Sequence, residues 1–306
     1  MKVSRTGIFI VLLLLINLCL LQYFISRYTE IYTDFFYPKA YESKFMSVRF
    51  FSLGNNDSCL VKTPTGKYIL IDTGRLLREL PGQVRGDRSE VMKYLLENEI
   101  YALDKIIITN PNHDYIGSLL YILMNIPVGE IIDGIGKGDT IVYKDVLAYL
   151  KRHPEIEYKR LAIGKVFDLD PFLKLRTLGP LEQYDNPRDT DSFVFKLEYD
   201  KIGFLFGSDI TSIAAADLTK YGPKLRSNIM KYPHHGLGGS WSYPFIYFVK
   251  PEVMIVSGLS LSLRGIIDAG ITNANYSFGS KIYSTEDGDI VITTDGKKYK
   301  ISKDSM

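Results

Sequence analysis

Histidine and aspartate, two side chains that bind metal ions and move protons, gather in a few short polar segments of this sequence. One segment reads TNPNHDYIGS (109–118), a later one reads PHHG (233–236), and between them Asp209 follows a strand-like run. Imidazole nitrogens and carboxylate oxygens hold zinc-type ions when they converge to about 2.0–2.2 Å from the ion. The candidate ligands are therefore His113, Asp114, Asp209, His234 and His235.

A strand-like run precedes each of these polar groups. Residues 105–109 lead into the first segment, residues 201–206 precede Asp209, and residues 228–231 precede the PHHG segment. A rigid sheet that ends in short polar loops is the usual support for a binding or catalytic site. These side chains could converge only if two sheets fold back on each other, so the sequence predicts a site at the edge of such a pair.

Strand-like and helix-like segments alternate along the rest of the chain. This order predicts an α+β fold in which two sheets pack together with helices outside, in four layers αββα. We read residues 45–306 as one domain, since no long linker or repeat interrupts them. The expected strands are 46–51, 58–62, 67–72, 105–109, 130–133, 173–178, 192–197, 201–206, 228–231, 253–256, 281–283 and 289–294, and the expected helices are 89–97, 118–125, 143–151, 211–220 and 241–249.

The N-terminal segment differs from the remainder of the chain. After Lys2 and Arg5, about 19 residues carry no charge, which is long enough for a helix to cross the hydrocarbon core of a membrane. We predict a cytoplasmic segment 1–6, a transmembrane signal anchor 7–26 and an aromatic-rich stalk 27–44, with the large domain extracytoplasmic. This makes the chain a single-pass protein of the cell membrane. A cleaved signal peptide and a buried helix are the alternatives.

Charge and cysteine content exclude several classes of protein. Without Lys2 and Arg5, the 37 basic residues become 35, equal to the 35 acidic residues, so the domain carries no strong nucleic-acid signal. The 2 cysteines, Cys19 and Cys59, lie far apart and support neither a disulfide framework nor a cysteine-based zinc site. The substrate or protein partner is not indicated by the sequence.

The order of these motifs resembles the metallo-β-lactamase superfamily, and within it the extracytoplasmic hydrolase-like domain of ComEC-type competence proteins. The resemblance covers nearly all of residues 46–299. It implies a metallo-β-lactamase fold and metal-dependent hydrolysis of a phosphodiester or ester. The matching segments are Gly54-Asn55-Asn56-Asp57-Ser58, Ile71-Asp72-Thr73-Gly74, residues 109–118, Gly207-Ser208-Asp209, Pro233-His234-His235-Gly236 and Thr294-Asp295-Gly296.

The departures from the family pattern fall on the metal ligands. Asn110, Asn112 and Tyr115 stand where the family has ligands, and the late Gly-His-Pro is missing. An amide oxygen is a poor substitute for imidazole or carboxylate toward zinc, so the usual two-ion site should be disabled. The resemblance leaves Asp114 as the catalytic candidate, Asp209 as the presumed metal-bridging ligand, and Asp72 as a residue that orients a ligand from behind.

Structural roles compete with these assignments. The two adjacent histidines could be a satisfied pair at a turn, and His113 a solvated loop residue. Asp114 and Asp209 could each be the N-cap of the helix that follows, a common role for aspartate. Asp72 could serve only the turn at Gly74.

Two hypotheses follow for the function. The first is a membrane-anchored hydrolase with a degenerate or single-ion site that holds one divalent metal, Zn or Mn. The second is a catalytically inactive pseudoenzyme without metal that binds a partner at the cell surface.

Overall fold

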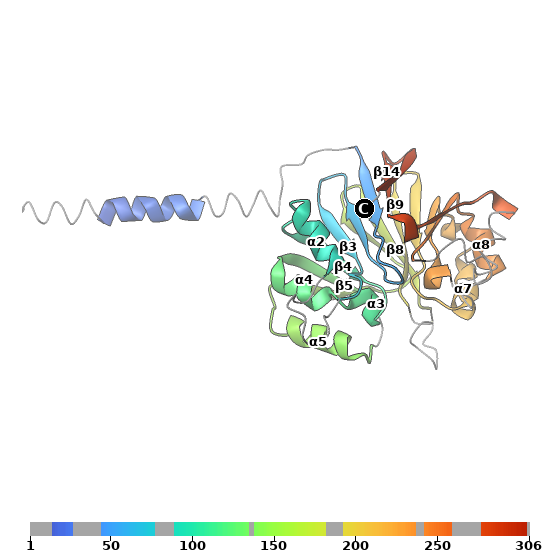
Figure 1. The fold of residues 1–306 in the computed structure, drawn as a ribbon, viewed down its shortest axis with the longest axis horizontal. Helices are drawn as coiled ribbons and strands as arrows, with labels where there is room; N and C mark the ends of the chain where they lie inside the picture. Colours follow the sequence, from blue (N-terminus) through green and yellow to red (C-terminus); the bar gives the residue numbers. More distant parts are fainter. Residues whose placement is uncertain are drawn as a thin grey trace, which may run out of the picture. The chain divides into compact units, whose positions relative to one another are not determined.

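The computed structural model describes residues 14–26, 44–76, 89–134, 138–181, 192–236, 242–258 and 277–304. The chain divides into two compact units, Met1–Tyr41 and Glu42–Met306. In the first unit, residues 14–26 form a helix (Figure 1). None of the helices in the described ranges has the length and apolarity that crossing a membrane requires. Residues 1–13 and 27–43, which include much of the predicted anchor and stalk, lie outside the described residues, so the anchor stays a prediction.

The first sheet of the second unit has eight strands and combines both kinds of pairing. Its order is β15-β14-β1-β2-β3-β4-β5-β6. The pairs from β14 to β3 are antiparallel and those from β3 to β6 are parallel. The strands are β1 (Met46–Phe50), β2 (Cys59–Lys62), β3 (Tyr68–Ile71), β4 (Leu103–Ile108), β5 (Val128–Asp133), β6 (Glu157–Arg160), β14 (Asp289–Thr294) and β15 (Tyr299–Asp304).

The second sheet has seven strands in the order β13-β12-β11-β10-β9-β8-β7. The pairs β10–β11, β11–β12 and β12–β13 are parallel, and those from β7 to β10 are antiparallel. The strands are β7 (Val166–Asp170), β8 (Leu173–Gly179), β9 (Val194–Tyr199), β10 (Ile202–Phe206), β11 (Ile229–Lys231), β12 (Val253–Val256) and β13 (Lys281–Ser284).

Three apolar cores hold these layers together. Alternate residues of the strands, such as Val48 on β1 and Phe204 on β10, pack between the two sheets. The free thiol of Cys59 on β2 is buried in this central core. The other face of each sheet packs against helices. These are α2 (Glu90–Glu97), α3 (His113–Ile116), α4 (Leu119–Asn125) and α5 (Ile141–Leu150) on the first sheet, and α7 (Ser212–Leu218), η1 (Thr219–Leu225) and α8 (Tyr243–Val249) on the second.

The predicted sandwich of two sheets with helices outside is confirmed (Figure 1). The helices α2 to α5 lie on one side of the paired sheets, and α7 and α8 lie on the other. Three strands, β6, β7 and β15, lie outside the strand ranges expected from the sequence. In β6 all four side chains are exposed, so its sequence lacks the apolar alternation that indicates a strand.

Candidate metal centre

The candidate ligands lie on loops at the C-terminal ends of strands from both sheets. Asp114 lies on α3, which follows β4 of the first sheet, while Asp209 follows β10 and His235 follows β11 of the second. Parallel neighbours present their carboxyl ends at the same edge, and β10 and β11 are such a pair. The central core fixes the two sheets against each other, so loops from both meet at one end of the sandwich.

Three of the candidates converge. The nitrogen Nε2 of His235 lies 3.9 Å from Oδ2 of Asp114 and 3.9 Å from Oδ1 of Asp209. Ligand atoms of all three residues lie within 4.8 Å of one another. Donors about 2.0–2.2 Å from one ion stand roughly 3.5 Å apart in tetrahedral geometry, so a small inward shift would complete such a site.

His235 shows the clearest sign that a partner belongs at this place. Its side chain is buried, and among the residues that the structure describes neither Nδ1 nor Nε2 has a hydrogen-bond partner. Buried polar atoms without a partner are rare in folded proteins. Burial also lowers the pKa of His235, and the neutral imidazole it favours is the form that binds metals. The residues present therefore fit a divalent ion.

The backbone at the site adopts conformations that ordinary residues avoid. His234 and His235 both have φ of 52°, and Ser208, next to Asp209, has φ of 48°. Residues other than glycine rarely enter this left-handed region, and they cluster at functional sites where the surrounding structure holds them. The amide of His234 donates to the carbonyl of Ser208 at 2.8 Å, which ties the two ligand loops together.

Asp209 is held by an unexpected neighbour. The hydroxyl of Tyr115, which stands where the family has a histidine ligand, donates to Oδ1 of Asp209. Burial raises the pKa of Asp209 to about 8, against the lowering effect of this hydrogen bond, and the carboxylate of Asp57 adds to the rise. Burial likewise raises the pKa of Tyr115 well above its usual range, so Tyr115 is a hydrogen-bond donor and not a phenolate ligand.

The two asparagines at ligand positions form hydrogen bonds that stabilise the loop after β4. Asn110 is buried, its amide donates to Oγ of Ser192 at 3.0 Å, and its carbonyl accepts from the amide of Asn112 at 2.9 Å. Asn112 in turn accepts the first backbone bonds of α3 through its carbonyl. These residues shape the loop that carries Asp114.

His113 and His234 stand apart from the converging group. Across the residues that the structure describes, the group that could hold an ion comprises Asp114, Asp209 and His235. The side chain of His113 is exposed, and that of His234 is half-buried with its ring centroid 6.5 Å from that of His235.

Asp72 holds the backbone at the end of β4 through hydrogen bonds to Thr109. Its carboxylate accepts from the amide of Thr109 at 2.8 Å and from the hydroxyl of Thr109 at 2.6 Å. That hydroxyl also lies 2.9 Å from Oγ of Ser208 in the second sheet. Asp72 therefore connects the ends of β3 and β4 with the loop after β10. Burial raises the pKa of Asp72 well above its usual range.

The two capping alternatives are not what the structure shows. The N-cap of α7 is Thr211, whose side chain accepts from the amide of Ala214. The N-cap of α3 is Asn112, and that of α4 is Ser118. Neither Asp114 nor Asp209 caps a helix, so both carboxylates are free to face His235.

Sequence reasoning missed a buried ion pair beside the candidate ligands. Nζ of Lys231 lies 2.8 Å from Oδ2 of Asp57, and the hydroxyl of Ser257 donates to Oδ1 of the same carboxylate. Nδ1 of His235 lies 3.9 Å from that oxygen. Burial alone would raise the pKa of Asp57, but Lys231 and His235 hold it at about 2. The lysine at the end of the apolar strand β11 was the signal, since buried lysines are almost always paired.

The amide of Asp57 also donates to the carbonyl of Asp114 at 3.1 Å. The carbonyl of Tyr115 accepts from the amide of Thr73 at 2.7 Å and from its hydroxyl at 3.1 Å. These bonds fix α3 to the loop before β2 and to the loop after β3. The position of Asp114 is therefore set by three strand ends of the first sheet.

Comparison with known proteins supports this description. No family model matches the chain. The chain is 24% identical over 214 residues to ComE operon protein 3 of Bacillus subtilis (strain 168), a match that covers 67% of this chain and 27% of the relative. It thus spans about a quarter of the length of that protein.

Solved structures resemble the fold. The CmlA β-hydroxylase E377D mutant has a TM-score of 0.51 at 12% identity, over 78% of this chain and 52% of that chain. A diphosphatase from the PhnP family has a TM-score of 0.47 at 13% identity, over 85% of this chain and 100% of that chain. CmlA from Streptomyces venezuelae, a diiron β-hydroxylase, has a TM-score of 0.47 at 12% identity, over 70% of this chain and 45% of that chain.

The layers of the sandwich, the similarity in fold and the similarity in sequence agree with one another. Together they confirm the predicted resemblance of this chain to metallo-β-lactamase-fold proteins and to ComE operon protein 3.

Proposed function

We propose that this protein is a metal-dependent hydrolase with a single-ion site, in which Asp114, Asp209 and His235 hold one divalent cation. The observation that carries the proposal is the convergence of these three donors around a buried imidazole without hydrogen bonds. A bound divalent ion supplies Lewis-acid polarisation and lowers the pKa of water. Zn and Mn both accept this mixture of nitrogen and oxygen donors.

The protein's own residues have distinct parts in this proposal. His235 and Asp209 are the buried ligands, and Tyr115 fixes the orientation of the Asp209 carboxylate. The Asp114 side chain is 38% exposed, so it is the member of the group that an incoming water or substrate can reach.

The substrate class follows from the resemblance. A phosphodiester or ester is the expected substrate, because the ComEC-like hydrolases that the motifs resemble act on such bonds. With one ion instead of two, turnover should be slow, since a two-ion site stabilises both the attacking and the leaving oxygen.

A second candidate function is a pseudoenzyme that uses the same surface to bind a partner. The observation that favours it is the loss of three family ligands at Asn110, Asn112 and Tyr115. The side chains of Asn110 and Tyr115 form hydrogen bonds within the protein. In both candidates we propose that residues 7–26 anchor the chain in the cell membrane with the large domain outside.

Metal analysis distinguishes the two functions. The purified 306-residue chain should contain close to one Zn or Mn ion, measured by elemental analysis, and should hydrolyse a phosphodiester slowly. His235→Ala should lose both metal and activity. His153→Ala is the matched control, because the His153 side chain lies at the surface, where it contacts Glu155 and stacks on Tyr149. A wild-type chain without metal and without turnover would leave the pseudoenzyme as the function.

A further inference from the structure

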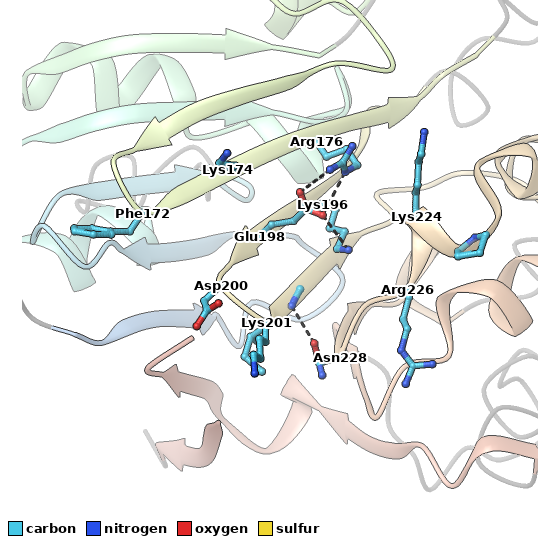
Figure 2. Close-up of a pocket in the computed structure, with 13 residues that line it drawn as sticks. Phe172, Lys174, Arg176, Lys196, Glu198, Asp200, Lys201, Lys224, Arg226 and Asn228 are labelled. Carbon is cyan, nitrogen blue, oxygen red and sulfur yellow. Dashed lines mark hydrogen bonds and ion pairs between the residues drawn. The ribbon is translucent and has the colours of Figure 1, made fainter. Parts of the chain in front are cut away.

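A pocket of about 510 Å³ opens on the outer face of the second sheet, at the end of the strands remote from the candidate metal centre. It includes Ile202 and Gly203 at the start of β10, whereas Asp209 follows the end of that strand. Figure 2 shows side chains from β8 and β9 facing side chains from the segment 223–228. Its volume is typical of a site for a small molecule.

The alternation of the strands explains why polar side chains lie here. Leu175 on β8 and Leu197 on β9 face the core between the sheets, so their neighbours Arg176 and Lys196 face outward. Further along the same outer face, residues such as Leu178 are covered by α7 and α8. The helices leave uncovered the first half of β8, the second half of the antiparallel β9 and the start of β10, and this uncovered region is the floor of the pocket.

The lining is strongly cationic although the chain as a whole is nearly neutral. Two acidic residues, Glu198 and Asp200, are outnumbered by six basic ones, which leaves four positive charges in excess. A concave surface with charge of one sign concentrates counter-ions. The basic residues are Lys174, Arg176, Lys196, Lys201, Lys224 and Arg226.

Only part of this charge is neutralised within the protein. Glu198 accepts from Arg176 at 3.1 Å and lies 3.1 Å from Nζ of Lys196. In the part of the chain that the structure describes, no ion pair joins Lys224 or Arg226 to an acid. Figure 2 shows these two side chains across the pocket from the Arg176–Glu198 pair.

Lys196 is built into the floor of the pocket. Its residue is buried, and its Cε lies 2.6 Å from where a Cβ on Gly203 would stand. A Cβ at position 203 would require the end of the Lys196 side chain to shift. The amide of Gly203 donates to Asn228 at 3.0 Å, which holds the floor against the segment 223–228. A buried lysine in a glycine cradle is a preformed cationic position, unlike a lysine on an open surface.

We propose that this pocket binds a small anion that contains a chain of two or three phosphate groups. A terminal phosphate carries about 1.5 to 2 negative charges at neutral pH, so a chain of this length matches the four positive charges in excess. Lysine and arginine are the usual partners of phosphate oxygens. The balanced total charge argues against a long polyanion, which would need a basic surface well beyond one pocket.

Titration with inorganic tripolyphosphate tests the site. Isothermal titration of the 306-residue chain in a mild detergent should show one saturable site. Lys224→Gln combined with Arg226→Gln should weaken the affinity at least about tenfold, the effect of losing one charge-assisted contact or more. Both residues are exposed, so the variant should fold normally. His235→Ala should bind as the wild type does, which separates this site from the candidate metal centre.

The matched control combines Lys93→Gln with Lys144→Gln, because these exposed lysines lie on α2 and α5 over the other sheet. The control variant should bind like the wild type. Gly203→Ala, which displaces the Lys196 ammonium without a change of charge, should also weaken binding. No saturable binding, equal affinity for citrate, or the same loss in the control variant would each overturn the proposal.

Discussion

The hydroxyl of Tyr115 connects the loop after β4 with Asp209, which we propose as a metal ligand. Tyr115→Phe removes this donor and keeps the packing of the buried ring. Residues that orient a metal ligand typically change metal affinity by about 10–100-fold when they are replaced. We therefore expect Tyr115→Phe to weaken Zn²⁺ binding by about that factor in a titration against a chelator of known affinity. Unchanged affinity would mean that the hydroxyl serves the fold alone.

The stability of the folded chain should depend on both members of the buried ion pair Lys231–Asp57. Lys231→Met leaves Asp57 buried without its cation, so the free energy of unfolding should fall by about 3–5 kcal/mol. Replacing both partners, Lys231→Met with Asp57→Leu, should recover at least half of that loss, because no unpaired charge remains. Urea denaturation measures both variants. Additive losses in the double variant would contradict a coupled pair.

At the scale of elements, ion pairs add to the backbone pairing that joins β6 to its sheet. All four of its side chains are exposed, and Nζ of Lys159 lies 3.0 Å from Oε1 of Glu130 on β5, which also accepts from Lys105 on β4. Burial would raise the pKa of Glu130, but these two lysines lower it below its ordinary value. The carboxylate thus joins three adjacent strands.

This lowered pKa gives a pH dependence with a definite sign. The pKa of Glu130 is lower in the folded chain than in the unfolded chain, so its contribution is fully present above about pH 4.3, the unfolded value. It is lost as the pH falls through the folded value. Glu130→Gln should therefore lower the free energy of unfolding by about 1–2 kcal/mol at pH 7 and by much less near pH 3. A pH-independent difference would contradict this assignment.

The elements that the sequence predicted are those with a regular apolar period. The hairpin β2–β3, the helix α2 with its N-cap Ser89, and the buried run of β4 all appear where alternation, capping and turn residues indicated them. β6 has no buried side chain, and β7 buries only its last two residues. Neither strand leaves a periodic signal, because both are edge strands with few buried side chains, and ion pairs support β6.

At the scale of the whole molecule, the sequence predicted which strand ends carry the site but not the contacts across it. The Tyr115–Asp209 bond joins residues 94 positions apart, and the Lys231–Asp57 pair joins residues 174 positions apart. Such contacts depend on how two sheets dock, and no local pattern records that arrangement. The resemblance to a family predicted the order of the segments. It could not show which partners the residues at the substituted ligand positions contact, such as Asp209 for Tyr115.

The predicted anchor can be tested on the whole chain in a bacterial host. The 306-residue chain should stay in the membrane fraction after an alkaline carbonate wash, since about 19 uncharged residues bury enough apolar surface to hold it there. A chain that begins at Lys44 should appear in the soluble fraction. Protease added to intact spheroplasts should degrade the large domain. Recovery of the 306-residue chain in the soluble fraction would contradict the anchor.

The thiol of Cys59 gives a direct measure of how often the sandwich opens. It is buried between the two sheets, and burial raises its pKa well above the usual range, so a thiol reagent reacts with it only while the sheets are apart. Cys19 is exposed and would react first, so the measurement needs a Cys19→Ser background. The labelling rate of Cys59 then reports the opening equilibrium under native conditions. If Zn²⁺ slows the labelling, the ratio of the two rates gives the free energy by which one shared ion stabilises the closed arrangement of the two sheets.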